Sequence, residues 1–314
     1  MPGSTEFLRA GHWVFGTGLR GTASPELFRR MAAGLEAAGS SMSSVARVDQ
    51  YYPDFSCVPP YQAARKQAFQ GRQVAPSTSV VVSALGDASS HVDLQVLAAT
   101  NESGYQPVEI NTRLNRPETS AYAPCIRVGD LIFVAGQLAR DASGKLAAQG
   151  VHAETQYIVH ERLAPALQAA GSGFDLILKA QAYVSRPQEI PAFERAWRQA
   201  GAPPTTVVPV RHPAFLTREA TVEINVLAAH RSARARLREV GAKARLLDGL
   251  LLAAGVTDLA EARKIFAAAG GDLSRVVRAL FFHAKGAAPA APGFPHSALE
   301  VESGLAIDLW GYIP

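Results

Sequence analysis

The feature that most constrains the fold of this chain is a motif that occurs three times. Each copy consists of a turn, a short apolar run and a glycine, and the copies span residues 11–18, 129–136 and 248–255. A helical segment that ends in Ala-Ala-Gly follows each copy, with its glycine at Gly39, Gly171 and Gly270. Such a repeat predicts three copies of one structural unit that pack together to bury a continuous core. A functional site would then lie between units.

The repeat predicts units over residues 1–102, 103–232 and 233–314. The middle unit is the fullest copy, with a hairpin, a helix over residues 155–170, a strand, a second helix over residues 190–200 and two closing strands. The first unit follows the same order. The third has a Pro/Ala/Gly-rich stretch over residues 285–293 in place of the second helix.

The composition is typical of a globular protein, because 48% of the residues are hydrophobic and only 18% are charged. The net charge of +4 is modest. A basic stretch over residues 231–245 has no interleaved aromatic side chains, so we interpret it as a solvated connecting helix and expect no nucleic-acid partner.

The sequence also bears on the compartment. No apolar run approaches the ~18 residues that a membrane helix needs, and the N-terminal residues lack the apolar segment of a secretory signal. The two cysteines, Cys57 and Cys125, are too far apart for a small disulfide framework, which favours a reducing compartment. We therefore expect a cytoplasmic protein that does not contact membranes.

The sequence gives little indication of a bound cofactor or metal ion. The glycines over residues 16–21 match GxGxxG, but the next helix is predicted to begin only at Ser24 and Pro25, too late for its N-terminus to hold a pyrophosphate. His152 and His160 lie eight residues apart, outside any common zinc-ligand spacing. We therefore expect neither a metal ion nor a cofactor.

Several segments of the middle unit resemble the RidA (YjgF/YER057c) family, whose members are also described as endoribonuclease L-PSP-like. The segments are residues 122–137, 163–171, 203–210 and 222–228. Residues 61–69 and 75–82 carry the same resemblance in the first unit. It implies a chorismate-mutase-like α+β fold with inward sheets, outward helices and ligand clefts between neighbouring units. Three fused units would form an intramolecular pseudo-trimer, for which a monomer suffices.

The resemblance also implies a chemistry, since the best-known members hydrolyse enamines and imines. They bind the substrate carboxylate with an arginine at the start of the penultimate strand, a position that falls near Ser77, Thr205 and His296. A glutamate on the last strand positions the water, and its place is taken by Gln95, Asn225 and Asp308. The tyrosine near the first strand is matched by Tyr122. No unit keeps the arginine, so a less acidic substrate or binding without chemistry also has to be considered.

These positions define the candidate site residues. His296 and Asp308 would form a catalytic acid/base couple if adjacent strands bring them together; otherwise they are a surface histidine and an edge-strand aspartate. Glu223 shares a strand face with Asn225 and is a third catalytic candidate, with a solvated sheet face as the alternative. Arg211 follows a closing strand and could replace the missing arginine. The remaining substrate-binding candidates are Tyr122, Thr205, Asn225, Ser77 and Gln95.

The sequence therefore favours a cofactor-free hydrolase that acts on a small molecule, an enamine, an imine or a related C–N substrate, in a cleft between units. Two alternatives stay open. One is a chorismatase-like hydrolase, since those enzymes also resemble fused RidA units. The other is a scaffold that binds a small molecule without catalysis.

Overall fold

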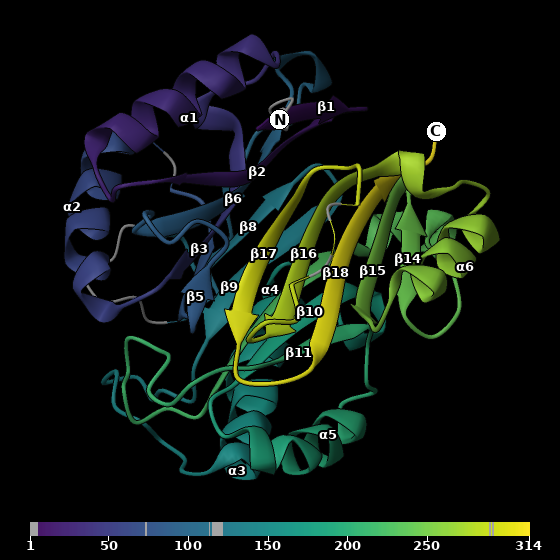
Figure 1. Cartoon of the computed structure of the whole chain (residues 1–314). Helices are drawn as coiled ribbons and strands as arrows, with labels where there is room; N and C mark the ends of the chain where they lie inside the picture. The colour runs from purple at the N-terminus through teal and green to yellow at the C-terminus, as the bar shows by residue number, and fades with distance from the viewer. Residues whose placement is uncertain (1–5, 73, 113, 115–121, 289, 291) are drawn as a thin grey trace.

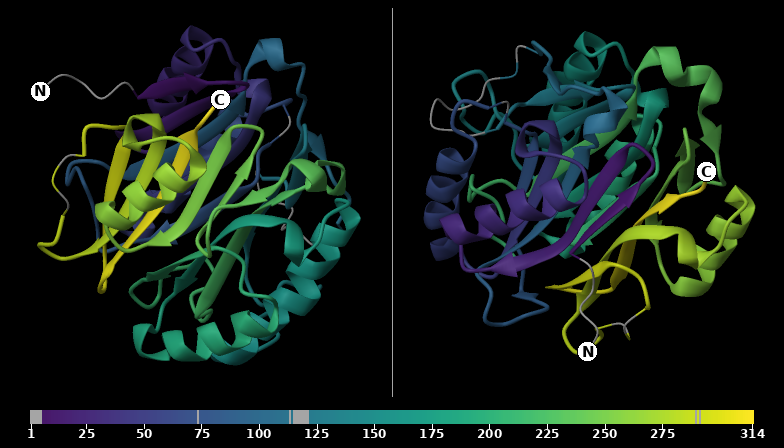
Figure 2. Two further views of the ribbon diagram at one scale, coloured as in Figure 1. Left: turned by 90° about the vertical axis from the view of Figure 1, so that its right-hand side faces the viewer. Right: turned by 90° about the horizontal axis from the view of Figure 1, so that it is seen from above.

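The computed structural model describes residues 6–72, 74–112, 114, 122–288, 290 and 292–314. Its strands form three mixed sheets, and its helices lie outside them (Figure 1). Two further views show the same arrangement from other sides (Figure 2). We call each sheet, with the helices that cover it, unit one, unit two and unit three in chain order. The predicted α+β class with inward sheets and outward helices is confirmed.

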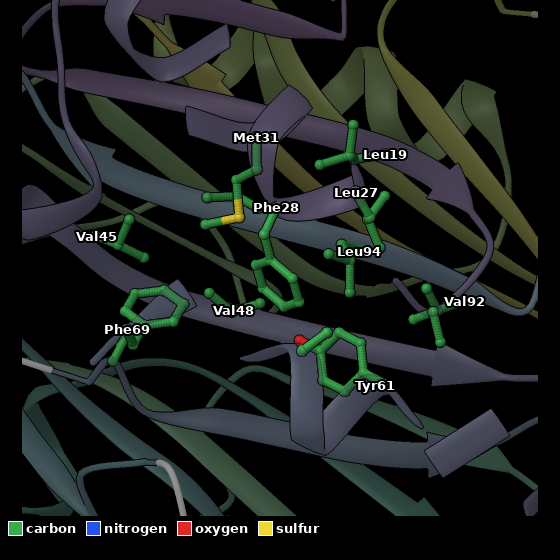
Figure 3. Packing of buried hydrophobic residues seen from close by; sticks show 14 of the residues in the cluster. Leu19, Leu27, Phe28, Met31, Val45, Val48, Tyr61, Phe69, Val92 and Leu94 are labelled. Atoms are coloured by element: carbon green, nitrogen blue, oxygen red, sulfur yellow. The ribbon is translucent and has the colours of Figure 1, made fainter. Parts of the chain in front are cut away.

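Unit one has the simplest sheet. Its strand order is β1 (Phe7–Ala10), β2 (Trp13–Gly21), β6 (Val92–Ala99), β3 (Val45–Tyr52) and β4 (Ser77–Val81). Only the β3–β4 pair is parallel. Helices α1 (Pro25–Ala37) and α2 (Val58–Ala68) cover the outer face. Phe28 and Met31 on α1 and Tyr61 on α2 pack onto buried sheet valines (Figure 3).

Unit two repeats this plan with longer helices. Its strand order is β11 (Thr205–Pro209), β10 (Ile177–Val184), β12 (Val222–Ala229), β9 (Leu131–Gln137), β8 (Cys125–Val128) and β7 (Val108–Glu109). The first helix runs through α3 (Val151–Tyr157), a π-helical turn and α4 (Ala164–Ala169), and the second is α5 (Ile190–Gln199). Both predicted helices of the middle repeat are therefore present.

Unit three is the reduced copy. Its strand order is β13 (Arg238–Glu239), β14 (Ala244–Leu247), β15 (Leu250–Val256), β18 (Leu305–Tyr312), β16 (Val276–Ala284), β17 (His296–Val301) and β5 (Ala84–Leu85). The edge strand β5 comes from the first third of the chain. Helix α6 (Leu259–Ala269) is the single α-helix in the described part of residues 233–314, as the sequence predicts.

The connecting helix predicted over residues 231–245 is wrong. A 3-10 helix covers Arg231–Arg236 and is followed by β13, a turn and β14, because this segment extends the sheet of unit three. Its basic side chains form exposed ion pairs, for example Arg236 with Asp130 at 2.5 Å and with Asp248 at 2.8 Å. In the described part of the chain, no helix is long and apolar enough to cross a membrane.

The strand pairings allow equivalent residues to be assigned in the three units. The pairing register shifts at the repeated glycine of each sheet, near Gly18, Gly136 and Gly255, and again after the first residue of β3, β10 and β16. Counting from these shifts, Arg47, Lys179 and Arg278 occupy one equivalent position, and Tyr51, Tyr183 and Phe282 another. The three aromatic rings meet with centroids 5.9–6.3 Å apart. The predicted pseudo-threefold arrangement is confirmed, with these rings at its centre.

The apolar side chains follow the same symmetry. One cluster lies between sheet and helices in each unit, and two further clusters combine residues of all three sheets on their inward faces. Each Å² of apolar surface that is buried on these inward faces stabilises the assembly of the units by about 25 cal/mol.

Candidate functional site

Each contact between units contains the same type of polar pair. The second residue of a penultimate strand presents a hydroxyl to a polar side chain on the last strand of the next unit. These pairs are Thr78 with Asn225 at 3.0 Å, Thr206 with Asp308 at 3.2 Å and Ser297 with Gln95 at 2.8 Å. We call the three contacts seam 1–2, seam 2–3 and seam 3–1 after the units that form them.

Seam 1–2 contains a buried carboxyl group, that of Glu223. The equivalent residue is Asp93 in seam 3–1, where it pairs with Arg20 at 2.6 Å, and Ala306 in seam 2–3. Glu223 lies on β12, is 5% exposed and accepts a hydrogen bond from the backbone N–H of Ser79 in unit one. Burial raises the pKa of Glu223 to about 8, although the Arg140 charge and the Ser79 hydrogen bond oppose the rise. The carboxyl group is therefore protonated at neutral pH, which is the state required of a proton donor.

The charge of Arg140 acts on Glu223, and Tyr122 lies close enough to both for their charges to act on its hydroxyl. Arg162 lies near Arg140 and Tyr122. Arg140 donates to the Thr217 hydroxyl, and Arg162 donates from Nε to Gln137 Oε1 at 3.3 Å. Burial raises the pKa of Tyr122, and the charges of Arg140, Glu223 and Arg162 act on the same hydroxyl. We call Glu223, Gln137, Tyr122, Arg140 and Arg162 the Glu223 cluster.

The charge of the Glu223 cluster favours an anion. Among the described residues, neither Arg140 nor Arg162 forms an ion pair with a carboxylate, and burial lowers the pKa of Arg162. Because Glu223 is protonated near neutral pH, the cluster carries excess positive charge. Tyr122, Arg140 and Arg162 are partly exposed, so the cluster reaches the surface beside a buried acid. Two guanidinium groups at such a position suit a ligand carboxylate.

Gly136 holds Glu223 in place. A Cβ atom on Gly136 would overlap the Glu223 carboxylate and lie 2.8 Å from its Cδ atom. We expect Gly136→Ala to lower the free energy of unfolding by about 1–3 kcal/mol, because the buried carboxyl group must move. Thermal unfolding checks this, with Gly271→Ala as the matched control, since the added Cβ would lie no closer than 3.1 Å to the Ile313 side chain and 3.4 Å to that of Arg275. Equal stability of the two variants would contradict the contact.

Asn225 and Gln95 occupy equivalent inward positions on the last strands. Asn225 is 2% exposed and donates to Thr78 Oγ1 and, at 3.2 Å, to Gln181 Oε1. Gln95 is fully buried and donates to Asp93 at 2.6 Å as well as to Ser297. Both side chains therefore take part in contacts between or within units.

The three residues at the predicted arginine position lie on the helix-covered side of their sheets. Ser77 pairs with Val48 of the outer core. Thr205 accepts a hydrogen bond from Trp197 Nε1 at 2.8 Å, and the His296 ring contacts Phe281 with centroids 5.8 Å apart. Since side chains alternate between strand faces, a displacement of one residue exchanges inside for outside. The inward hydroxyls come from the following residues, Thr78, Thr206 and Ser297.

The hypothesis that adjacent strands bring His296 and Asp308 together is wrong. Strand β16 lies between β17 and β18, and the two side chains belong to opposite faces of the sheet. Asp308 is fully buried at seam 2–3, where it accepts from Lys179 Nζ, from Gln181 at 3.2 Å and from Thr206. Asp308 therefore neutralises a buried lysine.

Arg211 is exposed on the loop after β11 and does not belong to the Glu223 cluster. The nearby cations are instead Arg140, which follows β9, and Arg162, on the first helix of unit two. Sequence reasoning missed both, because an arginine in a loop or on a helix has no periodic signal. Within the described residues, no three His, Cys, Asp or Glu side chains come together in a way that could hold a metal ion.

Comparisons with known proteins agree with this architecture. Residues 113–230 match the family model described as endoribonuclease L-PSP. A crystal structure of a chorismatase matches 71% of this chain and 76% of its own, at 13% identity and a TM-score of 0.57, which shows a shared fold. A search of curated proteins by sequence found no match.

Two shorter structures match about two fifths of this chain. A member of the YjgF/YER057c/UK114 family from Mycobacterium tuberculosis is 21% identical, covers 40% of this chain and 99% of its own, and has a TM-score of 0.34. Mmf1 from yeast is 16% identical, covers 40% of this chain and 100% of its own, and has a TM-score of 0.37.

Proposed function

Since this chain belongs to the RidA/YjgF/L-PSP family and folds as three units, we propose that it hydrolyses a small anionic molecule at seam 1–2. The observation that carries the proposal is the buried carboxyl group of Glu223, whose pKa burial raises to about 8, in a cluster with two arginines that have no carboxylate partner among the described residues. A proton donor next to an anion-binding pair suits a substrate that must be protonated while its carboxylate is held.

The reaction that fits this arrangement begins with protonation of a carbon atom. In an enol ether or an enamine, the C=C bond accepts a proton at its terminal carbon, which leaves an oxocarbenium or iminium carbon next to it. Water adds to that carbon, and the adduct releases an alcohol or an amine and leaves a ketone. Glu223 would give the first proton, and the proton released by the added water would restore it.

The remaining residues of the Glu223 cluster would bind and orient the substrate. One of the two arginines, Arg140 or Arg162, would hold the carboxylate attached to the reacting carbons, and the Tyr122 hydroxyl and the Gln137 amide would position the leaving group or the water. This arrangement uses the protein's own side chains alone.

Two substrate classes share this chemistry. Chorismate is a dicarboxylate that contains an enol ether, and the chorismatase with the same fold gives a reason to test it first. Enamines of 2-oxo acids are the second class, and they offer one carboxylate. Two arginines in the cluster favour the dicarboxylate, since each can bind one carboxylate by paired hydrogen bonds.

The test is to incubate the purified chain with chorismate and, separately, with an enamine generated in situ, and to measure release of the ketone product. Turnover of chorismate alone would assign the enol-ether reaction, and turnover of the enamine alone would assign the C–N reaction. Saturable binding of either compound without turnover would make the chain a binding scaffold and refute the hydrolase proposal.

We expect Arg162→Gln to raise KM for the substrate by about 10–100-fold, because a hydrogen bond to a charged group contributes about 1.5–3 kcal/mol. Steady-state kinetics measure the change. The matched control is Arg198→Gln on the exposed face of α5, which should leave KM unchanged. An unchanged KM in Arg162→Gln would place the carboxylate elsewhere.

A further inference from the structure

Arg47, Lys179 and Arg278 occupy equivalent positions, but the carboxylate available to neutralise the cation differs from seam to seam. Arg47 donates from Nε to both carboxylate oxygens of Asp49, at 3.0 and 2.8 Å. Lys179 pairs with Asp308 of unit three. All three cations are at least 95% buried. Seam 1–2 and seam 2–3 therefore each supply one carboxylate for the inward cation of the earlier unit.

Seam 3–1 supplies no carboxylate that pairs with Arg278 among the described residues. Leu280 of unit three stands where unit one has Asp49, and Gln95 of unit one stands where unit three has Asp308. Arg278 has no hydrogen-bond partner for Nε and Nη1 among the described residues, and it is 2% exposed. Asp93, the remaining carboxylate of this seam, is taken by Arg20 at 2.6 Å and by Ser297 at 3.1 Å.

The surroundings of Arg278 contain further unpaired groups. Its guanidinium lies over the Trp310 ring, 4.5 Å from the centroid, and near the Phe15 ring of unit one at 5.9 Å. Trp310 Nε1 and Thr17 Oγ1 are also buried without a partner among the described residues. Thr17 lies two residues beyond Phe15 on the same face of β2. Seam 3–1 thus combines a buried cation with unpaired polar groups from both units, among them one acceptor, Gln95 Oε1.

Carboxylates elsewhere at the centre act on Arg278 but do not pair with it. Asp49 and Asp308 both influence its charge. The hydrogen-bonding capacity of Asp49 is used by Arg47, and that of Asp308 by Lys179, Gln181 and Thr206. Counting these five groups gives three cations and two carboxylates. A buried charge without a partner is strongly destabilising, so the one cation in excess favours a neutralising group at this position.

We propose that seam 3–1 binds a small monovalent anion of halide size, held by Arg278 and the neighbouring N–H and O–H groups of Trp310 and Thr17. The low exposure of Arg278 and Trp310, 2% each, excludes a large ligand. The anion would take the place of the carboxylate that the other two seams provide. This site does not depend on the Glu223 cluster, so it can be tested whether or not the chain is a hydrolase.

The test uses the full chain with bromide and chloride as probes. We expect the Tm to rise by about 2–4 °C when chloride replaces gluconate at constant ionic strength, because an anion that binds only the folded state stabilises it. Arg278→Met should remove this dependence, and Arg263→Met on the exposed face of α6 should retain it. Crystals grown in bromide should show an anomalous peak beside Arg278.

A second variant covers the case in which Arg278→Met does not fold. Leu280→Asp gives Arg278 the carboxylate that Arg47 has in unit one, and it should abolish the bromide peak and the chloride dependence. A bromide peak without any change in Tm would indicate an adventitious ion only and overturn the proposal. An ordered water without anomalous signal beside Arg278 would overturn it as well.

Discussion

Replacement of Glu223 by glutamine is expected to lower kcat/KM for the hydrolysed substrate by about 10²–10⁴-fold, the usual contribution of a positioned general acid. Glutamine keeps the size and the hydrogen-bonding groups of the side chain but cannot deliver a proton of the required acidity. Steady-state kinetics at pH 7 measure the loss. A matched control is Glu194→Gln on the exposed face of α5, which should retain full activity.

The pH profile gives an independent check of the same residue. Because the pKa of Glu223 is raised to about 8, activity should be present below pH 8 and should fall as the pH rises through that value. The free energy of unfolding should also fall as the pH rises. The folded state holds the proton more tightly than the unfolded state, so this contribution is complete below about pH 4.5 and is lost as the pH rises to about 8. Glu223→Gln should remove both dependences.

A kcat/KM that is independent of Glu223 would refute its role as proton donor. If Glu223→Gln lowers activity but leaves the alkaline limb of the pH profile in place, another group supplies the proton. Circular dichroism of the variant separates either outcome from a loss of folding.

Asp308→Asn is expected to cause the largest loss of stability, about 3–5 kcal/mol, because the buried Lys179 amine loses its carboxylate and must either stay charged without a partner or give up its proton. Lys179 is 4% exposed, and Asp308 is fully buried. Burial already lowers the pKa of Lys179 to about 8 against the opposing effect of Asp308. Chemical denaturation at pH 7 measures the change in the free energy of unfolding.

The double variant Lys179→Met with Asp308→Leu separates the pair from its surroundings. Replacing a buried ion pair by apolar side chains of similar volume is often neutral, so the double variant should recover most of the stability lost by Asp308→Asn. If Asp308→Asn lies within about 1 kcal/mol of the parent, the ion pair does not hold seam 2–3 together.

Much of the fold could be predicted from the sequence because the repeat is local. The glycines near residues 18, 136 and 255 mark the same irregularity in three sheets, and the order of helices and strands follows from them. The absence of a second helix in unit three was visible in its Pro/Ala/Gly-rich stretch. The unit limits at residues 102 and 232 stay predictions.

The site was less predictable because it depends on strand face and strand order. A displacement of one residue placed Ser77, Thr205 and His296 on the wrong side of their sheets. Two strands consecutive in sequence, β17 and β18, turned out to be separated by β16. Glu223 was predicted to share a strand face with Asn225, and both side chains are buried at seam 1–2 rather than on a solvated sheet face. Its catalytic role stays a prediction. The arginines of the Glu223 cluster come from a loop and a helix, whose approach only tertiary packing decides.

The small strand β5 has a consequence for how this molecule closes into a ring. A polypeptide of three units has only two covalent connections between them, so its first and last units have no peptide link. Ala84 and Leu85 pair with Glu300 and Leu299 at that open joint, and Ser83 donates from its backbone N–H to the Glu300 carbonyl at 2.9 Å. Backbone hydrogen bonds from the N-terminal third of the chain thereby hold the C-terminal third in place where no peptide link connects the two units.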